Sequence, residues 1–172
     1  AILNWLTLQR ENLNLNRVVE LGCGFGFFAS EIHSAGLSSV GIDISATAIE
    51  KARLKNPSCV FIQSALSNFE LLSKFDFDVY IMSEITWYVL DDLASFVEWL
   101  KLQAKSRGRP IYLVHLLTVY GVGVQKYGTD FFTNLDQVLG WFRLDFIESG
   151  FVKTVRADDP ESQGTYFIAK VS

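Results

Sequence analysis

The chain has 172 residues, which is enough for one domain with a sizeable core and too few for two comfortable ones. Hydrophobic residues make up 49% of the chain and charged residues 20%, a globular composition that excludes disordered and fibrous proteins. The net charge is −4 and no basic run is present, which argues against nucleic acid as a partner. The longest apolar run, residues 111–124, contains His115 and two glycines and falls short of a bilayer span, so no membrane partner is expected.

The chain has two cysteines, Cys23 and Cys59. Their spacing fits neither a metal site nor a disulfide framework, so we expect no metal and, by default, a reducing cytoplasmic compartment. We expect no signal peptide before the first strand. We expect one domain over residues 1–172, and the sequence leaves the oligomeric state open.

The first two thirds of the chain alternate between strand and helix patterns. Residues 1–16 are expected to form a helical cover over one edge of the core. Ser45 is a suitable N-cap for one of the later helices, and Asp91 or Asp92 for another. This alternation of apolar strands and helices predicts a parallel sheet with helices on both faces. The expected strands are 17–21, 39–42, 59–63, 78–83 and 111–116, and the expected helices are 26–35, 45–55, 66–74 and 91–106.

The last third of the chain follows a different pattern. Residues 118–132 form a long irregular stretch, which we interpret as a lid over a substrate. A capping box at 133–136 predicts a helix that continues to Glu148 and ends by Gly150. Two strands, 152–156 and 165–171, are joined by a polar turn, and such a direct hairpin must be antiparallel.

The most informative stretch is residues 18–29, VVELGCGFGFFA, where Gly22, Gly24 and Gly26 follow a short apolar strand and precede a helix. A strand, a glycine turn and a helix N-terminus bring the backbone close to a nucleoside-type ligand. The dinucleotide fingerprint G-x-G-x-x-G would need a glycine where this chain has Phe27. The glycines could also form a tight turn that binds no ligand.

The observed pattern is E-x-G-x-G-x-G, beginning at Glu20, and it resembles motif I of the class I S-adenosylmethionine-dependent methyltransferases that act on small molecules. The order of the expected elements is similar too. The resemblance implies an α/β, doubly wound, mostly parallel seven-stranded sheet with an antiparallel last strand. It also implies S-adenosylmethionine as the cofactor.

The resemblance carries over to individual cofactor-binding residues. It implies that Glu20, Gly22, Cys23, Gly24 and Gly26 lie along the methionine part of the cofactor. Asp43, which ends the second expected strand, would bind the ribose, although it could instead help to cap the next helix. Ile44 would pack on the adenine.

Two further segments are expected near the cofactor. After the third strand the family usually has an acid that accepts from the adenine amine, but this chain has Ser64, Ala65 and Leu66. The Ser64 hydroxyl and the backbone amides near Ala65 and Leu66 would take over part of that contact. The fourth strand ends at Ser83, where the resemblance implies that the methyl group lies.

The remaining candidates concern the acceptor. Glu84 would hold an amine or take a proton from a hydroxyl, and His115 is either a general base or a satisfied core residue. Trp87 and Tyr88 would wall the acceptor pocket or pack in the core. The aromatic residues expected to contact the substrate from the long loop are Tyr120 and Tyr127.

The sequence therefore predicts a methyltransferase that moves a methyl group to a hydroxyl or amine of a small-molecule acceptor, such as a sugar or another metabolite. Two alternatives remain. One is a non-catalytic binding module with the same fold, which the missing acid near Ala65 leaves open. The other is a nicotinamide-dependent oxidoreductase, against which Phe27 argues.

Overall fold

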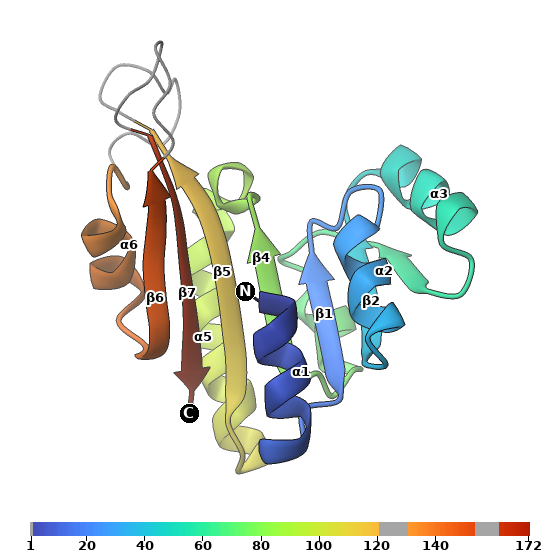
Figure 1. The fold of residues 1–172 in the computed structure, drawn as a ribbon, viewed down its shortest axis with the longest axis horizontal. Helices are drawn as coiled ribbons and strands as arrows, with labels where there is room; N and C mark the ends of the chain where they lie inside the picture. Colours follow the sequence, from blue (N-terminus) through green and yellow to red (C-terminus); the bar gives the residue numbers. More distant parts are fainter. Residues whose placement is uncertain (1, 121–130, 154–161) are drawn as a thin grey trace.

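The computed structural model describes residues 2–120, 131–153 and 162–172, and its strands form a single sheet in the order β3-β2-β1-β4-β5-β7-β6 (Figure 1). Within the described chain, every strand except β7 points the same way. The predicted fold class, a mostly parallel seven-stranded sheet with an antiparallel last strand, is confirmed. The strands are β1 (Arg17–Leu21), β2 (Ser38–Asp43), β3 (Val60–Gln63), β4 (Val79–Ser83), β5 (Ile111–Val119), β6 (Asp145–Lys153) and β7 (Gln163–Val171).

Helices cover both faces of this sheet. In Figure 1, α1 and α2 lie in front of the sheet and α5 lies behind it. Successive residues of a strand point to opposite faces, so Val18 packs with α1 and α2 while Val19 packs in the core on the α5 side. The helices are α1 (Ile2–Asn12), α2 (Phe27–Ser34), α3 (Ala46–Lys55), α4 (Phe69–Ser73), the 3₁₀ helix η1 (Thr86–Tyr88), α5 (Leu90–Arg107) and α6 (Leu135–Phe142).

Local capping signals explain most helix boundaries. The Ser45 hydroxyl accepts a hydrogen bond from the Ala48 backbone N–H at the start of α3, as predicted. Gly108 ends α5 in the left-handed conformation with a φ of 64°. The prediction that Asp91 or Asp92 caps α5 is wrong. Val89 occupies the cap without a side-chain bond, and both acids lie inside the first turn, where the helix dipole favours negative charge.

The C-terminal boundaries differ from the prediction. The helix α6 ends at Phe142, because Arg143 adopts a left-handed φ of 48°, and residues 145–153 form β6 rather than a continued helix. Pairing with β7 makes residues 145–153 a strand. The Phe146 ring packs 5.2 Å from that of Phe167, and Gly150 lies inside β6, where an added β-carbon would come within 2.8 Å of the Tyr166 ring.

The predicted lid, residues 118–132, begins later than expected. Residues 118 and 119 belong to β5, which pairs along its whole length with β7. Most of the predicted lid, residues 121–130, and most of the turn predicted between the last two strands lie outside the described residues.

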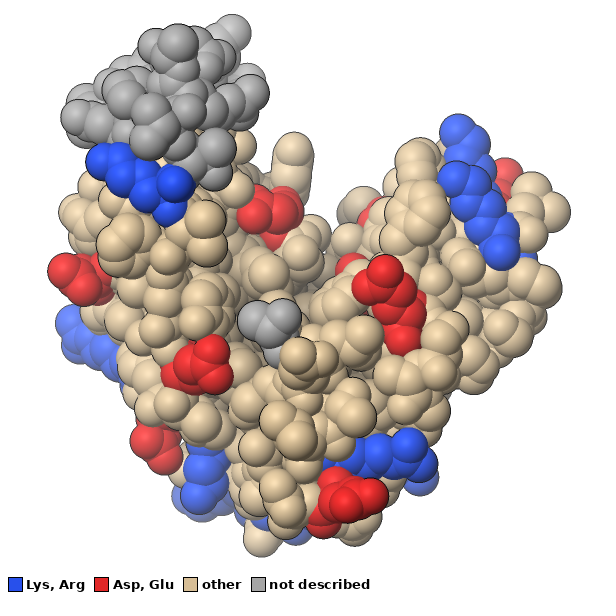
Figure 2. All heavy atoms as spheres, viewed as in Figure 1, with Lys and Arg blue, Asp and Glu red and all other residues tan. Residues whose placement is uncertain are grey.

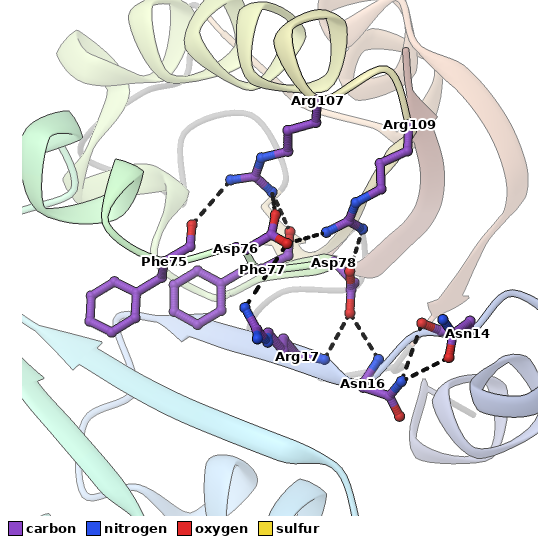
Figure 3. Close-up of polar contacts among 9 residues, drawn as sticks. All are labelled: Asn14, Asn16, Arg17, Phe75, Asp76, Phe77, Asp78, Arg107 and Arg109. Atoms are coloured by element: carbon purple, nitrogen blue, oxygen red, sulfur yellow. Dashed lines mark hydrogen bonds and ion pairs between the residues drawn. The ribbon is translucent and has the colours of Figure 1, made fainter.

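A network of charged side chains joins β1, β4 and the end of α5 (Figure 3). The Asp78 carboxylate accepts the backbone N–H groups of Asn16 and Arg17, both at 2.9 Å, and pairs with Arg109. Arg109 and Arg107 also pair with Asp76, at 2.7 and 3.2 Å. The network therefore holds the strand starts together at the edge of the sheet that lies away from the predicted site.

Candidate functional site

The carboxyl ends of β1 and β4 point toward a notch in the surface. Figure 2 shows this notch between the arm around α3 and the side of the molecule where β5 ends and β7 begins. Two pockets open at this edge. Ligands of open α/β sheets bind beyond the carboxyl ends of the strands, so the notch is where a ligand is expected.

The first pocket has a volume of about 430 Å³ and a mainly apolar wall. It contains several residues that the sequence analysis assigned to the cofactor, drawn from the ends of three neighbouring strands. It is lined by Leu21, Gly22, Ile42, Asp43, Ile44, Ser64, Ala65, Leu66, Ile85, Tyr88, Val89 and Asp92.

Asp43 is the last residue of β2, and its carboxylate faces the glycine turn. One oxygen accepts the Gly24 backbone N–H at 2.9 Å, and the other accepts the Ser45 N–H at 2.8 Å. Each carboxylate oxygen can accept a second hydrogen bond. Asp43 therefore fixes the turn and the start of α3, and it still has acceptor capacity toward the pocket.

The three glycines of the turn have positive φ values, of 71° for Gly22, 53° for Gly24 and 75° for Gly26. Only Gly22 lines the first pocket. A β-carbon on Gly24 would meet no atom within 4 Å, so the backbone there borders open space. A β-carbon on Gly26 would lie 2.4 Å from the Phe61 ring, so this glycine serves close helix-to-strand packing rather than a ligand.

Glu20 and Cys23 are buried and line neither pocket. Glu20 Oε2 accepts the Ala29 backbone N–H at 2.9 Å, which ties the first turn of α2 to β1. Burial raises the pKa of Glu20 to about 7. Burial likewise raises the pKa of the Cys23 thiol to about 12, so the thiol stays protonated.

Phe25 and Phe27 do not block the site. Phe25 is 43% exposed and Phe27 is 61% exposed, and neither lines a pocket at this edge. The Lys55 ammonium lies over both rings, 5.2 and 4.9 Å from their centroids. The rings thus point away from the cavity, toward α3.

The second pocket, of about 540 Å³, contains Ser83 and Glu84 at the end of β4. Ile85, the next residue, lines the first pocket, so consecutive residues at the end of β4 line the two pockets. The wall of the second pocket combines residues of α1, α2, β5, β6 and β7. Its other residues are Ile2, Leu3, Phe28, Glu31, Leu116, Val152, Gly164, Thr165 and Tyr166.

Glu84 is held in a fixed position in this pocket. It has a left-handed φ of 57°, an uncommon conformation for a residue with a side chain. Its carboxylate accepts the Thr118 backbone N–H at 2.9 Å and the Thr118 hydroxyl at 3.0 Å. The side chain remains exposed to solvent, so its free lone pairs can reach a molecule in the pocket.

His115 lies in the core and lines neither pocket. It is fully buried, its ring stacks on Phe167 with centroids 4.8 Å apart, and Nε2 lies 2.7 Å from the Thr86 hydroxyl. Burial lowers its pKa to about 3, which keeps the imidazole neutral. Of the two interpretations of His115, the structure favours the core residue over the base.

The aromatic candidates lie in different places. Tyr88 lines the first pocket rather than the second, and it is 87% exposed. Trp87 is half-buried, donates its indole N–H to the Thr118 carbonyl at 2.9 Å, and packs near Phe132. Tyr120 is half-buried and lines neither pocket, and Tyr127 lies outside the described residues.

Sequence reasoning missed several pocket residues. Ile85, Val89 and Asp92 line the first pocket, and their place just after the fourth strand was a usable signal, because that strand ends at the ligand edge. Tyr166 and Glu31 line the second pocket without any local signal. Among the residues that the structure describes, no group of three or more His, Cys, Asp or Glu side chains could hold a metal ion, and no helix is long and apolar enough to cross a membrane.

Comparison with known proteins identifies the family. A family model described as a methyltransferase domain matches residues 18–108, more than half of the chain. This protein therefore belongs to the methyltransferase domain family, and the resemblance predicted from the glycine motif is confirmed. The family's methyl donor, S-adenosylmethionine, is the cofactor that the sequence predicted.

Solved structures share the fold. Magnesium protoporphyrin IX methyltransferase from Synechocystis PCC 6803, with bound SAH, matches with a TM-score of 0.69 at 16% identity, covering 99% of this chain and 80% of its own. A SAM-dependent methyltransferase from Methanosarcina mazei matches with a TM-score of 0.63 at 16% identity, covering 91% and 92%. The bifunctional kinase-methyltransferase WbdD matches with a TM-score of 0.66 at 20% identity, covering 97% of this chain and 38% of its own. A search of curated protein sequences gives no match.

Proposed function

We propose that this protein is an S-adenosylmethionine-dependent methyltransferase that methylates a hydroxyl or amine of a small molecule. The observation that carries the proposal is the position of Asp43. Its carboxylate lies at the end of β2, hydrogen-bonded to the glycine turn, and faces a cavity of about 430 Å³. An acceptor-only side chain at this place suits the two hydroxyls of a ribose.

The residues around the first pocket fit the nucleoside part of the cofactor. In the proposed arrangement Asp43 accepts the ribose hydroxyls, Ile44 and Leu66 pack on the two sides of the base, and Ser64 and Ala65 lie along its edge. Gly24 leaves room for the chain that leads to the sulfur, whereas a β-carbon on Gly22 would lie 2.1 Å from Ile85 Cγ2, so Gly22 lets Ile85 pack against the turn. This arrangement uses the open space at Gly24 and the apolar lining of the pocket.

The end of β4, where residues 83 and 84 line the second pocket and residue 85 lines the first, is the proposed place of transfer. When bound, S-adenosylmethionine supplies a methyl group on a positively charged sulfur, and the thioether is a good leaving group. The work of the protein is then to align the acceptor with the methyl carbon and to exclude water. Ile85 lies on the cofactor side of this point, Ser83 and Glu84 line the second pocket, and the acceptor enters from that pocket.

Glu84 is the proposed group that handles the acceptor. Its carboxylate is oriented by Thr118 in the second pocket. It accepts a hydrogen bond from a neutral amine, whose nitrogen lone pair attacks the methyl carbon and whose proton then leaves, or it takes the proton from a hydroxyl as the new bond to carbon forms. The apolar wall of the second pocket suits a small acceptor with a flat or hydrocarbon body.

Calorimetric titration with S-adenosylmethionine and, separately, with NADH tests the cofactor. We expect binding of the first and none of the second. Asp43→Ala should weaken binding roughly hundredfold, since charge-assisted hydrogen bonds to both hydroxyls are lost. Asp91→Asn removes an acid that is exposed and outside both pockets, and it should bind like the wild type. Unchanged affinity of Asp43→Ala would remove Asp43 from the site.

A methyl-transfer screen with labelled cofactor tests the activity. Small hydroxyl- and amine-bearing compounds are the expected acceptors. Glu84→Gln should lower turnover roughly 100-fold or more while cofactor affinity stays the same. Cofactor binding without transfer to any acceptor would favour the non-catalytic binding module instead.

A further inference from the structure

Asp92 lines the first pocket and has no part in the contacts proposed above. It belongs to the first turn of α5, whereas Asp43 belongs to the end of β2. The pocket therefore receives a carboxylate from each of two separate elements. Its remaining wall is mostly apolar, with Leu66, Ile85 and Val89 among the lining residues.

The two carboxylates differ in what they already bind. Both Asp43 oxygens accept backbone N–H groups. The Asp92 carboxylate makes no hydrogen bond or ion pair with any residue in the described part of the chain, although the residue is half-buried. Ser64, which also lines the pocket, donates its hydroxyl to the Ala65 carbonyl at 3.3 Å. Of the two carboxylates in the pocket lining, Asp92 is thus the one without a partner in the described part of the chain.

An ionised carboxylate accepts hydrogen bonds and cannot donate them. The ligand group that satisfies Asp92 must therefore carry an N–H or O–H donor. With the ribose on Asp43, the part of the nucleoside left to reach Asp92 is the base, and adenine carries an exocyclic amine on its edge. Hypoxanthine carries a carbonyl oxygen at the same position, and a carboxylate placed to accept from the amine repels this oxygen. The N1–H of hypoxanthine lies one ring position away, so the base would have to shift before it could donate to Asp92.

We propose that Asp92 accepts a hydrogen bond from the exocyclic amine of the cofactor's adenine and makes the first pocket select adenine over hypoxanthine. This inference rests on the proposed function, because it places an adenosyl cofactor in the first pocket. It assigns the base contact to the start of α5 rather than to residues 64–66, which supply no carboxylate.

Asp91 provides a matched control. Asp91 and Asp92 are both in the first turn of α5, so the negative charge of each interacts with the helix dipole with similar stabilising energy. Asp91 is exposed and lies outside the pocket. Replacing either by asparagine removes one negative charge from the same turn, and only the Asp92 change alters the pocket.

The experiment measures, by calorimetry, the affinities of S-adenosylhomocysteine and S-inosylhomocysteine for the wild type, Asp92→Asn and Asp91→Asn. The wild type should prefer the adenosyl compound by roughly 100-fold. The preference should fall about tenfold or more in Asp92→Asn, because the new amide N–H can donate to the inosine carbonyl. Asp91→Asn should keep the wild-type preference.

The outcomes separate the inference from the proposed function. A wild-type preference that Asp92→Asn retains overturns the role of Asp92 while leaving the cofactor site in place. Wild-type protein that binds neither compound overturns the proposed function itself. Asp92→Ser is a second variant that tests the same contact. Its hydroxyl is too short to repeat the carboxylate contact, so it should also lose the preference. Thermal unfolding of Asp92→Ser and Asp91→Asn checks that both variants are folded.

Discussion

Glu20 and His115 are both buried, and burial sets the protonation of each. Burial raises the pKa of Glu20 from its ordinary 4.5 to about 7, opposed by the hydrogen bond from Ala29 and assisted by the charge of Asp43. Burial lowers the pKa of His115 from 6.5 to about 3. In both cases the neutral form is favoured, as expected for groups removed from water without a counterion.

The raised pKa of Glu20 predicts a pH-dependent stability. Between pH 4.5 and 7 the folded state holds a proton that the unfolded state releases. Its contribution is fully present below pH 4.5 and is lost as the pH rises through about 7, a loss of about 3 kcal/mol. Glu20→Gln keeps an acceptor for the Ala29 N–H and cannot ionise. Its free energy of unfolding, relative to the wild type, should rise by about that amount from acid to neutral pH.

Urea unfolding of both proteins at several pH values measures this difference. The comparison must be between variant and wild type, because His115 acts in the opposite direction. Its lowered pKa gives stability that is present above pH 6.5 and lost as the pH falls toward 3. Parallel pH profiles of Glu20→Gln and the wild type would show that the Glu20 carboxyl titrates normally in the folded state.

At the scale of elements, the turn between β1 and α2 is the part on which the site depends. It combines three positive-φ glycines with two carboxylates that accept backbone N–H groups on either side of it. Glu20 holds the start of α2, and Asp43 holds Gly24. The geometry of the proposed cofactor pocket is therefore set by hydrogen bonds between these two side chains and the backbone of the turn and of α2.

Gly26→Ala should destabilise the protein more than Gly108→Ala. Both glycines have positive φ, of 75° and 64°, so both substitutions cost about 1 kcal/mol of backbone strain. The β-carbon at Gly108 meets no atom within 4 Å, whereas that at Gly26 would lie 2.4 Å from the Phe61 ring. Overpacking should add about 1–3 kcal/mol at Gly26. Denaturant unfolding of the pair checks this, and equal costs would mean that Phe61 moves aside freely.

At the scale of the whole molecule, the two pockets and the charged network that joins the strand starts lie at opposite edges of the sheet. The pockets open at the carboxyl ends of the strands, and the Asp76–Asp78 network closes the other edge (Figure 3). Burial opposes charge on Asp76, but the Arg109 hydrogen bond, with the charges of Arg109, Arg107 and Arg17, holds the pKa of Asp76 below its ordinary value. Asp76 should therefore stay ionised at neutral pH.

Asp78→Asn should cost about 2–3 kcal/mol of stability without changing cofactor affinity. The Asp78 side chain is 7% exposed and joins β1 to Arg109, so its loss leaves a partly buried guanidinium with one partner fewer. Asp76 is 52% exposed, and Asp76→Asn should cost less than about 1 kcal/mol. Thermal unfolding compares the two, and a larger loss for Asp76 would contradict this ranking.

The sequence by itself determined the features that arise from neighbouring residues. The alternation of apolar runs and helix signals gave the α/β sheet, the Ser45 cap fixed the start of α3, and the glycine pattern after β1 gave the turn. Asp43 was found because it directly ends a strand, and parallel strands end at the ligand edge.

Only the tertiary structure decided the features that arise from residues far apart in the chain. Residues 145–153 become a strand because β7 offers hydrogen bonds to pair with, which outweighs their local helix pattern. His115 lies in the core and outside both pockets, because its ring packs against the rings of Phe142 and Phe167. Asp92 and Tyr166 reach the pockets because separate elements converge there. Periodicity and capping record local preferences, whereas burial and cavity lining depend on how the whole chain packs.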